Sequence, residues 1–207
     1  MNAETIRSIL SRHTPLQSVD YCVELWVRYH FDFILRKSRI TKIGDFAVHP
    51  GKPAQITVNH DLHPYLFLMT YVHEVAHLDV HLSAGHRAEA HGAEWKTAFK
   101  RLFLPVMNEE NFPTDLLEAL RRHMANPKAT IFSDAGLMLA FRKYDPHTAA
   151  MTFLSELPAG SIFQLRKRWF KKGETKRTRI LCQEVKTKKK YWVPMDAAVK
   201  NVQLSLL

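Results

Sequence analysis

A histidine-containing motif inside an apolar segment constrains this chain more than any other feature. Residues 73–77 are His-Glu-Val-Ala-His, a match to H-E-x-x-H, and the surrounding residues 65–82 are apolar with few breaks. The segment predicts a buried helix over 62–84, on which His73 and His77 lie one turn apart on the same face. Burying two imidazoles and the Glu74 carboxylate is costly unless something binds them. The sequence therefore predicts a metal site, with Glu74 beside the metal and placed to take a proton from water.

A catalytic zinc site needs a third protein ligand and keeps its fourth position for water. His81 continues the same helix face, but it lies two turns, roughly 12 Å, beyond His73, so we expect a neighbour rather than a ligand. Three candidates follow the expected end of the helix: His86, His91 and Glu94. Glu94 would suit a site that uses a carboxylate ligand. We favour His91.

Two segments together, 73–77 and His91-Gly92-Ala93-Glu94-Trp95, resemble the SprT-like metalloprotease family, which includes Spartan. The lead-in at 56–59 is also similar, and the resemblance covers about residues 15–110. It implies an α+β, zincin-like metalloprotease domain in which His73, His77 and His91 hold Zn²⁺ and Glu74 is the general base. It also implies a zinc metalloendopeptidase with a protein substrate. Spartan-type members cleave proteins that are bound or crosslinked to DNA.

Hydrophobic periodicity predicts the elements around the motif. We expect helices at 3–12, 14–30, 62–84, 91–107, 114–122 and 134–144, with Thr14 capping the second of them. Trp95 is expected to pack behind His91 as a hydrophobic anchor. Short strands are expected at 33–40, 44–48 and 55–58. Such a small sheet packed on helices is common in zincins, where the strand nearest the metal helix can bind an extended substrate.

The C-terminal quarter of the chain has a different pattern. Residues 157–160 (Leu-Pro-Ala-Gly) indicate a boundary, and the segments 161–170, 178–185 and 190–193 alternate or are rich in β-forming residues. With turns expected at 172–174 and 186–189, they predict a small antiparallel β meander. The predicted domains are therefore a metalloprotease domain at 1–155 and a β module at 156–207.

All of the excess positive charge lies in this module. The chain has a net charge of +10, and residues 166–190 contain twelve Lys or Arg against two Glu, while the rest of the chain is neutral. Cations that neutralise phosphates and aromatic rings that stack on bases suit single-stranded or irregular DNA. The predicted nucleic-acid contacts are Arg166, Arg168, Lys171, Lys172, Arg177, Arg179, Lys188 and Trp169.

The module departs from the family, because many SprT-like proteins carry a cysteine-rich zinc ribbon there and this region has only Cys182. Two other functions stay open. The chain could be a nucleic-acid-binding protein with a structural zinc site and no protease activity, which a closed four-ligand site would favour. It could also be a metal-dependent hydrolase with a small substrate, which a deep closed pocket would favour.

Composition limits where the protein works. No apolar run reaches about 18 residues, so we expect no membrane-spanning helix. The first ten residues lack the pattern of a secretion signal, and the two cysteines, Cys22 and Cys182, are expected to be free thiols in a reducing compartment. These features predict a cytoplasmic protein without a membrane partner, and we expect a monomer.

Overall fold

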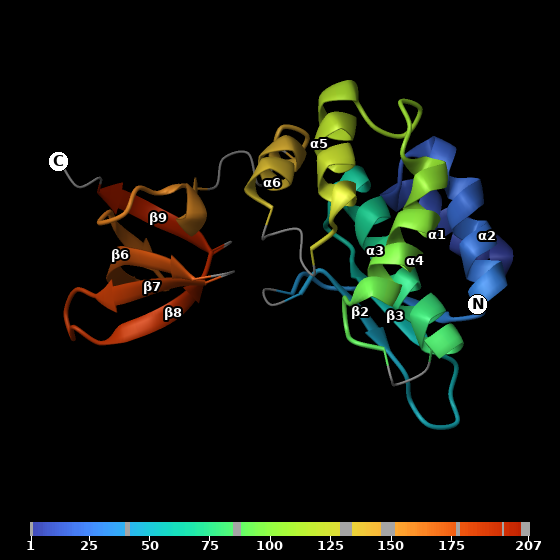
Figure 1. Ribbon diagram of the computed structural model, residues 1–207, viewed down its shortest axis with the longest axis horizontal. Coiled ribbons are helices and arrows are strands. Elements are labelled where there is room, and N and C mark those ends of the chain that lie inside the picture. The colour runs from blue at the N-terminus through green and yellow to red at the C-terminus, as the bar shows by residue number, and fades with distance from the viewer. Residues whose placement is uncertain are drawn as a thin grey trace. The chain divides into compact units, whose positions relative to one another are not determined.

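The computed structural model describes residues 2–39, 42–84, 88–128, 134–145, 152–176, 179–195 and 197–203, with 201–203 described by their backbone alone. By its internal contacts the chain divides into two compact units, Met1–Pro127 and Lys128–Leu207, which we describe separately (Figure 1). The boundary predicted between residues 155 and 156 lies inside the second unit. Both helices and strands are present, so the chain is α+β, as predicted.

Helices make up most of the described first unit: α1 (Ala3–His13), η1 (Leu16–Ser18), α2 (Val19–Tyr29), α3 (Pro64–Ala84), α4 (Ala93–Phe103), η3 (Leu104–Val106) and α5 (Thr114–Ala125). Asn2 caps α1, because its side chain accepts a hydrogen bond of 2.8 Å from the Thr5 amide. The prediction that Thr14 caps the second helix is wrong. Its hydroxyl donates to the Leu10 carbonyl at 2.9 Å, so it closes the end of α1, and α2 begins only after the short turn η1.

Helix α3 lies at the centre of the first unit. Side chains around its whole circumference, including Phe67, Leu68, Tyr71 and Val72, are fully buried. A helix that is apolar on every side has to be enclosed by other elements, and α1, α2, α4, β2 and β3 all contact α3. The predicted buried helix is therefore confirmed. It begins two residues later than predicted and ends where predicted.

A three-stranded sheet lies beside this helix (Figure 1). It consists of β1 (Asp32–Arg36), β2 (Gly44–Ala47) and β3 (Gln55–Asn59), in the order β1-β3-β2. Strand β1 is parallel to β3, and β2 is antiparallel to it. The central strand β3 is buried along most of its length, whereas β2 forms one edge of the sheet and is half-buried.

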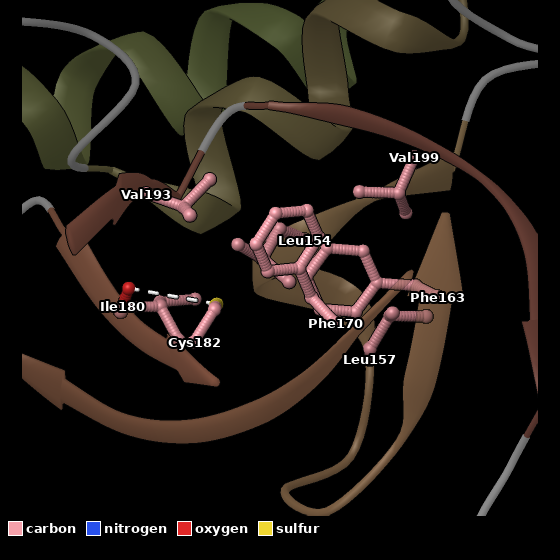
Figure 2. Packing of buried hydrophobic residues seen from close by; sticks show 8 residues of the cluster. All are labelled: Leu154, Leu157, Phe163, Phe170, Ile180, Cys182, Val193 and Val199. Atoms are coloured by element: carbon pink, nitrogen blue, oxygen red, sulfur yellow. Dashed lines mark hydrogen bonds between the residues drawn. The ribbon is translucent and has the colours of Figure 1, made fainter. Parts of the chain in front are cut away.

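The second unit is built from α6 (Ala135–Arg142), β4 (Thr152–Phe153), η5 (Leu154–Glu156), β5 (Ile162–Leu165), β6 (Arg168–Lys176), β7 (Arg179–Glu184), β8 (Lys190–Pro194) and β9 (Ala198–Gln203). Its strands form one antiparallel sheet in the order β4-β9-β5-β6-β7-β8. One face of this sheet closes on a small core that η5 helps to fill (Figure 2). The core residues are Leu154, Leu157, Phe163, Phe170, Ile180, Cys182, Val193 and Val199.

The predicted meander is correct in kind but wrong at one turn. Residues 172–174 lie inside β6, and the chain instead reverses at Arg166 and Lys167, which have φ of 49° and 65°. Gly173 marks a β-bulge, since the β6–β7 register shifts between Lys172 and Thr175. An added Cβ at Gly173 would lie 2.7 Å from the Leu181 carbonyl oxygen, so the strand pairing itself requires glycine there.

Both cysteines are buried free thiols. Within the described part of the chain, no helix has the length and apolar character needed to cross a membrane.

Candidate metal centre

Helix α3 supplies two of the residues that the sequence predicted as metal ligands. His73 and His77 lie one turn apart, and their Nε2 atoms are 3.2 Å from each other. Because side chains at i and i+4 share a helix face, the helix backbone alone brings these rings together. The tight packing around α3 then fixes the helix within its unit.

His91 comes from the turn before α4, and the structure brings it to the other two rings. Its Nε2 lies 3.0 Å from that of His77 and 3.3 Å from that of His73. Its φ of 62° is left-handed, a conformation that costs a residue with a side chain about 1–3 kcal/mol. The ring of Trp95 packs against it with a centroid distance of 4.7 Å. Trp95 is 1% exposed, which agrees with its predicted role as an anchor.

The triangle of Nε2 atoms has the dimensions of a metal site. A tetrahedral Zn²⁺ with Zn–N distances of about 2.0–2.1 Å would hold its nitrogen ligands roughly 3.3 Å apart. Among the described residues, the three histidines form the one group of His, Cys, Asp and Glu side chains arranged to hold an ion. The carboxylate alternative, Glu94, is not a member, and His86 lies outside the described residues.

The cluster is enclosed by aromatic rings. The ring of Trp95 lies 4.6 Å from that of His73 and 5.4 Å from that of His77, and Phe46 of β2 stacks on His77 at a centroid distance of 6.4 Å. Phe46 also contacts His81 at 5.7 Å. His81 is therefore a neighbour of the cluster through Phe46, as its position two turns along the helix predicted.

Burial is the main cause of a lowered pKa at each of the three rings. The pKa of His77 falls to about 4, that of His73 falls well below its usual value, and that of His91 is also lowered. Neighbouring imidazoles lower the pKa of His73 and His77 further. Neutral rings with converging lone pairs are the protonation state that a metal ion requires. Imidazole ligands suit Zn²⁺ and other divalent transition-metal ions.

Glu74 is a buried carboxyl group that follows His73 on α3. It is 7% exposed, and burial raises its pKa to about 8. Asp45 adds to this increase, while Arg39 and Lys42 oppose it. A carboxyl group whose pKa is moved toward neutrality by a buried environment is typical of general acid–base chemistry. A divalent cation at the cluster would favour the ionised carboxylate.

Gly44 is a residue that the sequence did not single out. A Cβ added there would overlap Glu74 Oε1 and lie 2.6 Å from Thr70 Cγ2. Strand β2 can therefore approach α3 at this point only because Gly44 has no side chain. A glycine near the start of a short predicted strand was the available signal, but nothing in the pattern paired it with Glu74.

Asn59 holds the segment before β2 close to Glu74. It is 1% exposed; its Nδ2 donates to the carbonyls of Arg39 at 3.4 Å and Lys42 at 3.2 Å, and its Oδ1 accepts from Arg39 Nε at 2.8 Å. These bonds fix the backbone that carries the two cations whose charge lowers the pKa of Glu74. Asn59 therefore contributes to the electrostatics of the site from the end of β3.

Two of the predicted nucleic-acid contacts are engaged inside the second unit. Lys172 is 7% exposed, and its ammonium donates to the carbonyls of Ser155 and Leu157, so its prediction as a contact is wrong. It lies on the core face because strand β6 continues through the residues predicted as a turn. Arg168 is exposed but pairs with Glu184 at 2.6 Å and donates to the Tyr191 hydroxyl at 2.9 Å.

The other predicted contacts that the structure describes are exposed or half-buried, and one of them, Arg179, donates a hydrogen bond of 3.4 Å to the Trp192 carbonyl. Arg166 and Lys188 lie exposed in turns, with φ of 49° and 60°. Lys171 and Arg179 are exposed on strands, and Trp169 is half-buried. Arg177 lies outside the described residues.

The fold and the cluster define an α+β protein with a three-histidine site that can hold a metal ion. Comparison with known protein families, with curated proteins and with solved structures finds no match to this chain. The likeness of its two motifs to the SprT-like family therefore stays a resemblance, and the chemistry has to be argued from the geometry of the chain itself.

Proposed function

We propose that this protein is a zinc-dependent metallopeptidase. The proposal rests on one observation above all: three imidazole Nε2 atoms lie 3.0–3.3 Å apart. The residue that follows the first of these histidines, Glu74, is buried. A site with three protein ligands keeps a position for water, as catalytic zinc sites do, whereas structural zinc sites are closed by four. The SprT-like resemblance supports the same assignment for His73, His77, His91 and Glu74.

In the proposed reaction, His73, His77 and His91 would hold a Zn²⁺ ion, which would supply Lewis acidity toward a water molecule and the scissile carbonyl. Glu74 accepts a proton from the attacking water, so that the oxygen can form its bond to the carbonyl carbon. The same carboxyl group then gives that proton to the leaving nitrogen as the carbon–nitrogen bond breaks. The raised pKa of Glu74, about 8 before a cation is bound, suits a group that has to accept and return a proton.

An extended polypeptide is the substrate shape that we favour. Strand β2 is at an edge of the small sheet, and it carries Gly44 against Glu74 and Phe46 against His77. An edge strand offers unpaired backbone groups to which an extended chain can add. The resemblance makes proteins bound or crosslinked to DNA the substrate class to test first. A loosely folded DNA-binding protein, with and without single-stranded DNA, is the corresponding assay.

The test combines metal content with cleavage. We expect about one zinc per chain by elemental analysis, lost or weakened in His91→Ala. Glu74→Gln should keep the zinc and abolish cleavage of casein or a histone. His81→Ala is the matched control, since it removes an imidazole from the same helix outside the cluster and should keep both properties. If Glu74→Gln cleaved the substrate at the wild-type rate, the assignment of Glu74 as the base would be refuted. If the wild-type protein held no zinc after reconstitution, the metal site would be refuted.

The second candidate, a nucleic-acid-binding protein with structural zinc, is favoured by the concentration of charge in residues 166–190. It predicts a different outcome of the same test. The wild type and Glu74→Gln would retain zinc and His91→Ala would lose it, but neither wild type nor Glu74→Gln would cleave any protein substrate.

A further inference from the structure

The strand register of the second unit gathers basic and aromatic side chains on one face of its sheet. Lys171 of β6 is paired with Gln183 of β7, which is paired in turn with Lys190 of β8. Residues that are directly opposite in neighbouring strands project from the same face. The two lysines, both exposed, therefore lie in one row across three strands, roughly 10 Å apart.

A tryptophan flanks this row on each side. Trp169 precedes Lys171 by two residues and Trp192 follows Lys190 by two, so both share the face of the lysines. Leu181 of β7 is opposite Trp192. Trp192 is 45% exposed and Trp169 is half-buried. The face thus presents two indole rings with two ammonium groups between them.

The opposite face of the same strands forms the core. Phe170, Ile180, Cys182 and Val193 alternate with the residues above and are buried (Figure 2). Glu184 is buried on that side as well, where it pairs with Arg168. The outer face of β6–β8 is therefore not needed to fill the core. The strand β6 is regularly paired up to Lys172, before its bulge. The outward residues of this part of β6, and those of β7 and β8, include no acidic side chain.

We propose that this outer face, defined by Trp169, Lys171, Arg179, Gln183, Lys190 and Trp192, binds single-stranded nucleic acid. The cations neutralise phosphates and the indole rings stack on unpaired bases. Gln183 lies between the two lysines; its Nε2 donates to the Lys188 carbonyl at 3.0 Å, and its Oε1 is the acceptor that it offers to a ligand. Charge complementarity favours a polyanion, because the excess positive charge of the whole chain lies in this segment. Rings interleaved with cations on a sheet suit bases and phosphates that alternate along one strand.

This surface lies wholly within the second unit, so the proposal stands independently of the metal centre. The proposed surface differs from the set of nucleic-acid contacts predicted from the sequence. It includes Trp192 and Lys190, and it excludes Lys172 and Arg168 because these two residues belong to the core face.

Fluorescence anisotropy of the full chain with a labelled oligothymidylate of about 20 nucleotides tests the proposal. We expect Trp192→Ala to weaken binding about tenfold and Trp192→Phe to retain most of the affinity, because a phenyl ring still stacks. The double variant Lys171→Gln/Lys190→Gln should also lose about tenfold, with a salt-dependence slope lower by about 1.4. Lys52→Gln removes an exposed cation from the first unit and should bind as wild type does.

Two results would overturn the proposal. One is unchanged affinity in both Trp192→Ala and the double lysine variant. The other is binding of the wild type to phosphatidylserine vesicles, with the same dependence on Trp192, and none to the oligonucleotide; the face would then be a lipid-binding surface. Equal melting temperatures of wild type and variants establish that a loss of affinity comes from the surface, since the substituted side chains lie outside the core.

Discussion

The three-histidine cluster and the outer sheet face are assembled in different ways. In the cluster, one helix turn fixes His73 and His77, and a single turn residue, His91, completes a half-buried group. On the sheet face, each of three strands contributes exposed side chains, and only the pairing of Lys171, Gln183 and Lys190 makes them neighbours. A motif within one helix thus shows its geometry in the sequence, whereas a sheet face shows it only when the register is known.

The two regions should also respond differently to substitution. A metal ion needs all its ligands at once, so the loss of one imidazole should remove most of the affinity. The sheet face instead sums several exposed and separate contacts, and such contributions are close to additive. Single changes should therefore abolish the function of the first region and only reduce that of the second.

The largest effect is expected from His77→Ala. This change removes the ring whose Nε2 lies within 3.2 Å of both other ligands, so the protein should lose its zinc and all metal-dependent cleavage. Binding of the oligothymidylate should stay within about twofold of wild type, because the proposed surface belongs to the other compact unit. Elemental analysis and anisotropy on the same sample measure both. A joint loss of zinc and oligonucleotide binding would mean that the two regions do not act independently.

Gly44→Ala should separate catalysis from metal binding. The new methyl group would overlap Glu74 Oε1, so we expect the carboxylate to be displaced and cleavage to fall about 100-fold while zinc is kept. Zinc content and steady-state cleavage measure the two properties. The added Cβ would also lie 2.6 Å from Thr70 Cγ2, and Gly44→Ala/Thr70→Ser removes that second contact. Full recovery in the double variant would assign the loss to Thr70 instead of Glu74.

Lys172→Met tests the core face of the sheet. The ammonium is buried and donates to the carbonyls of Ser155 and Leu157. Its removal leaves buried acceptors unpaired, so we expect the second unit to lose about 1–3 kcal/mol of stability, measured by urea unfolding. Lys171→Met, one residue earlier on the exposed face, is the control and should leave stability nearly unchanged. A weaker oligonucleotide affinity in Lys172→Met at full stability would return this residue to the binding surface.

Much of the histidine cluster can be predicted because its constraints are local. The i, i+4 spacing places two histidines, and the apolar segment 65–82 predicts burial. The residues after the helix leave three candidates for the third ligand, of which we favour His91, and the SprT-like resemblance implies the same residue. The left-handed backbone of His91 has no signal in the sequence. The contact between Gly44 and Glu74 is different, because it joins a strand to a helix through space and leaves no periodic signal.

The turns and faces of the basic module are harder to predict from the sequence, for a physical reason. Arg166 and Lys167 form the turn between β5 and β6 in left-handed conformations, which are uncommon for residues other than glycine. Gly173, by contrast, resembles a turn residue but lies in a bulge within β6. Placing the turn at 172–174 hides the alternation of faces along β6. Lys172 was therefore assigned by its charge alone.

The smallest effect is expected from Glu184→Gln, and it depends on pH. Hydrogen bonds from Arg168 and Thr187 lower the pKa of Glu184 to about 2. Because the folded-state pKa lies below that of the unfolded chain, the ionised carboxylate stabilises the fold above the unfolded pKa. This contribution is lost as the pH falls through about 2. Wild type should therefore be more stable than Glu184→Gln at neutral pH, and the difference should shrink progressively in acid.

Urea unfolding of both proteins across this pH range measures the difference. Glu174→Gln, which removes an exposed carboxylate from the same sheet, should leave the unfolding curves nearly unchanged. Oligonucleotide affinity at neutral pH adds a second measurement, because Glu184 faces the core and its loss frees the Arg168 guanidinium. Unchanged affinity would confirm that the outer face binds without Arg168. A clear gain in affinity would instead mean that the cations of the core face can reach the nucleic acid, which would end the division between the two faces of the sheet.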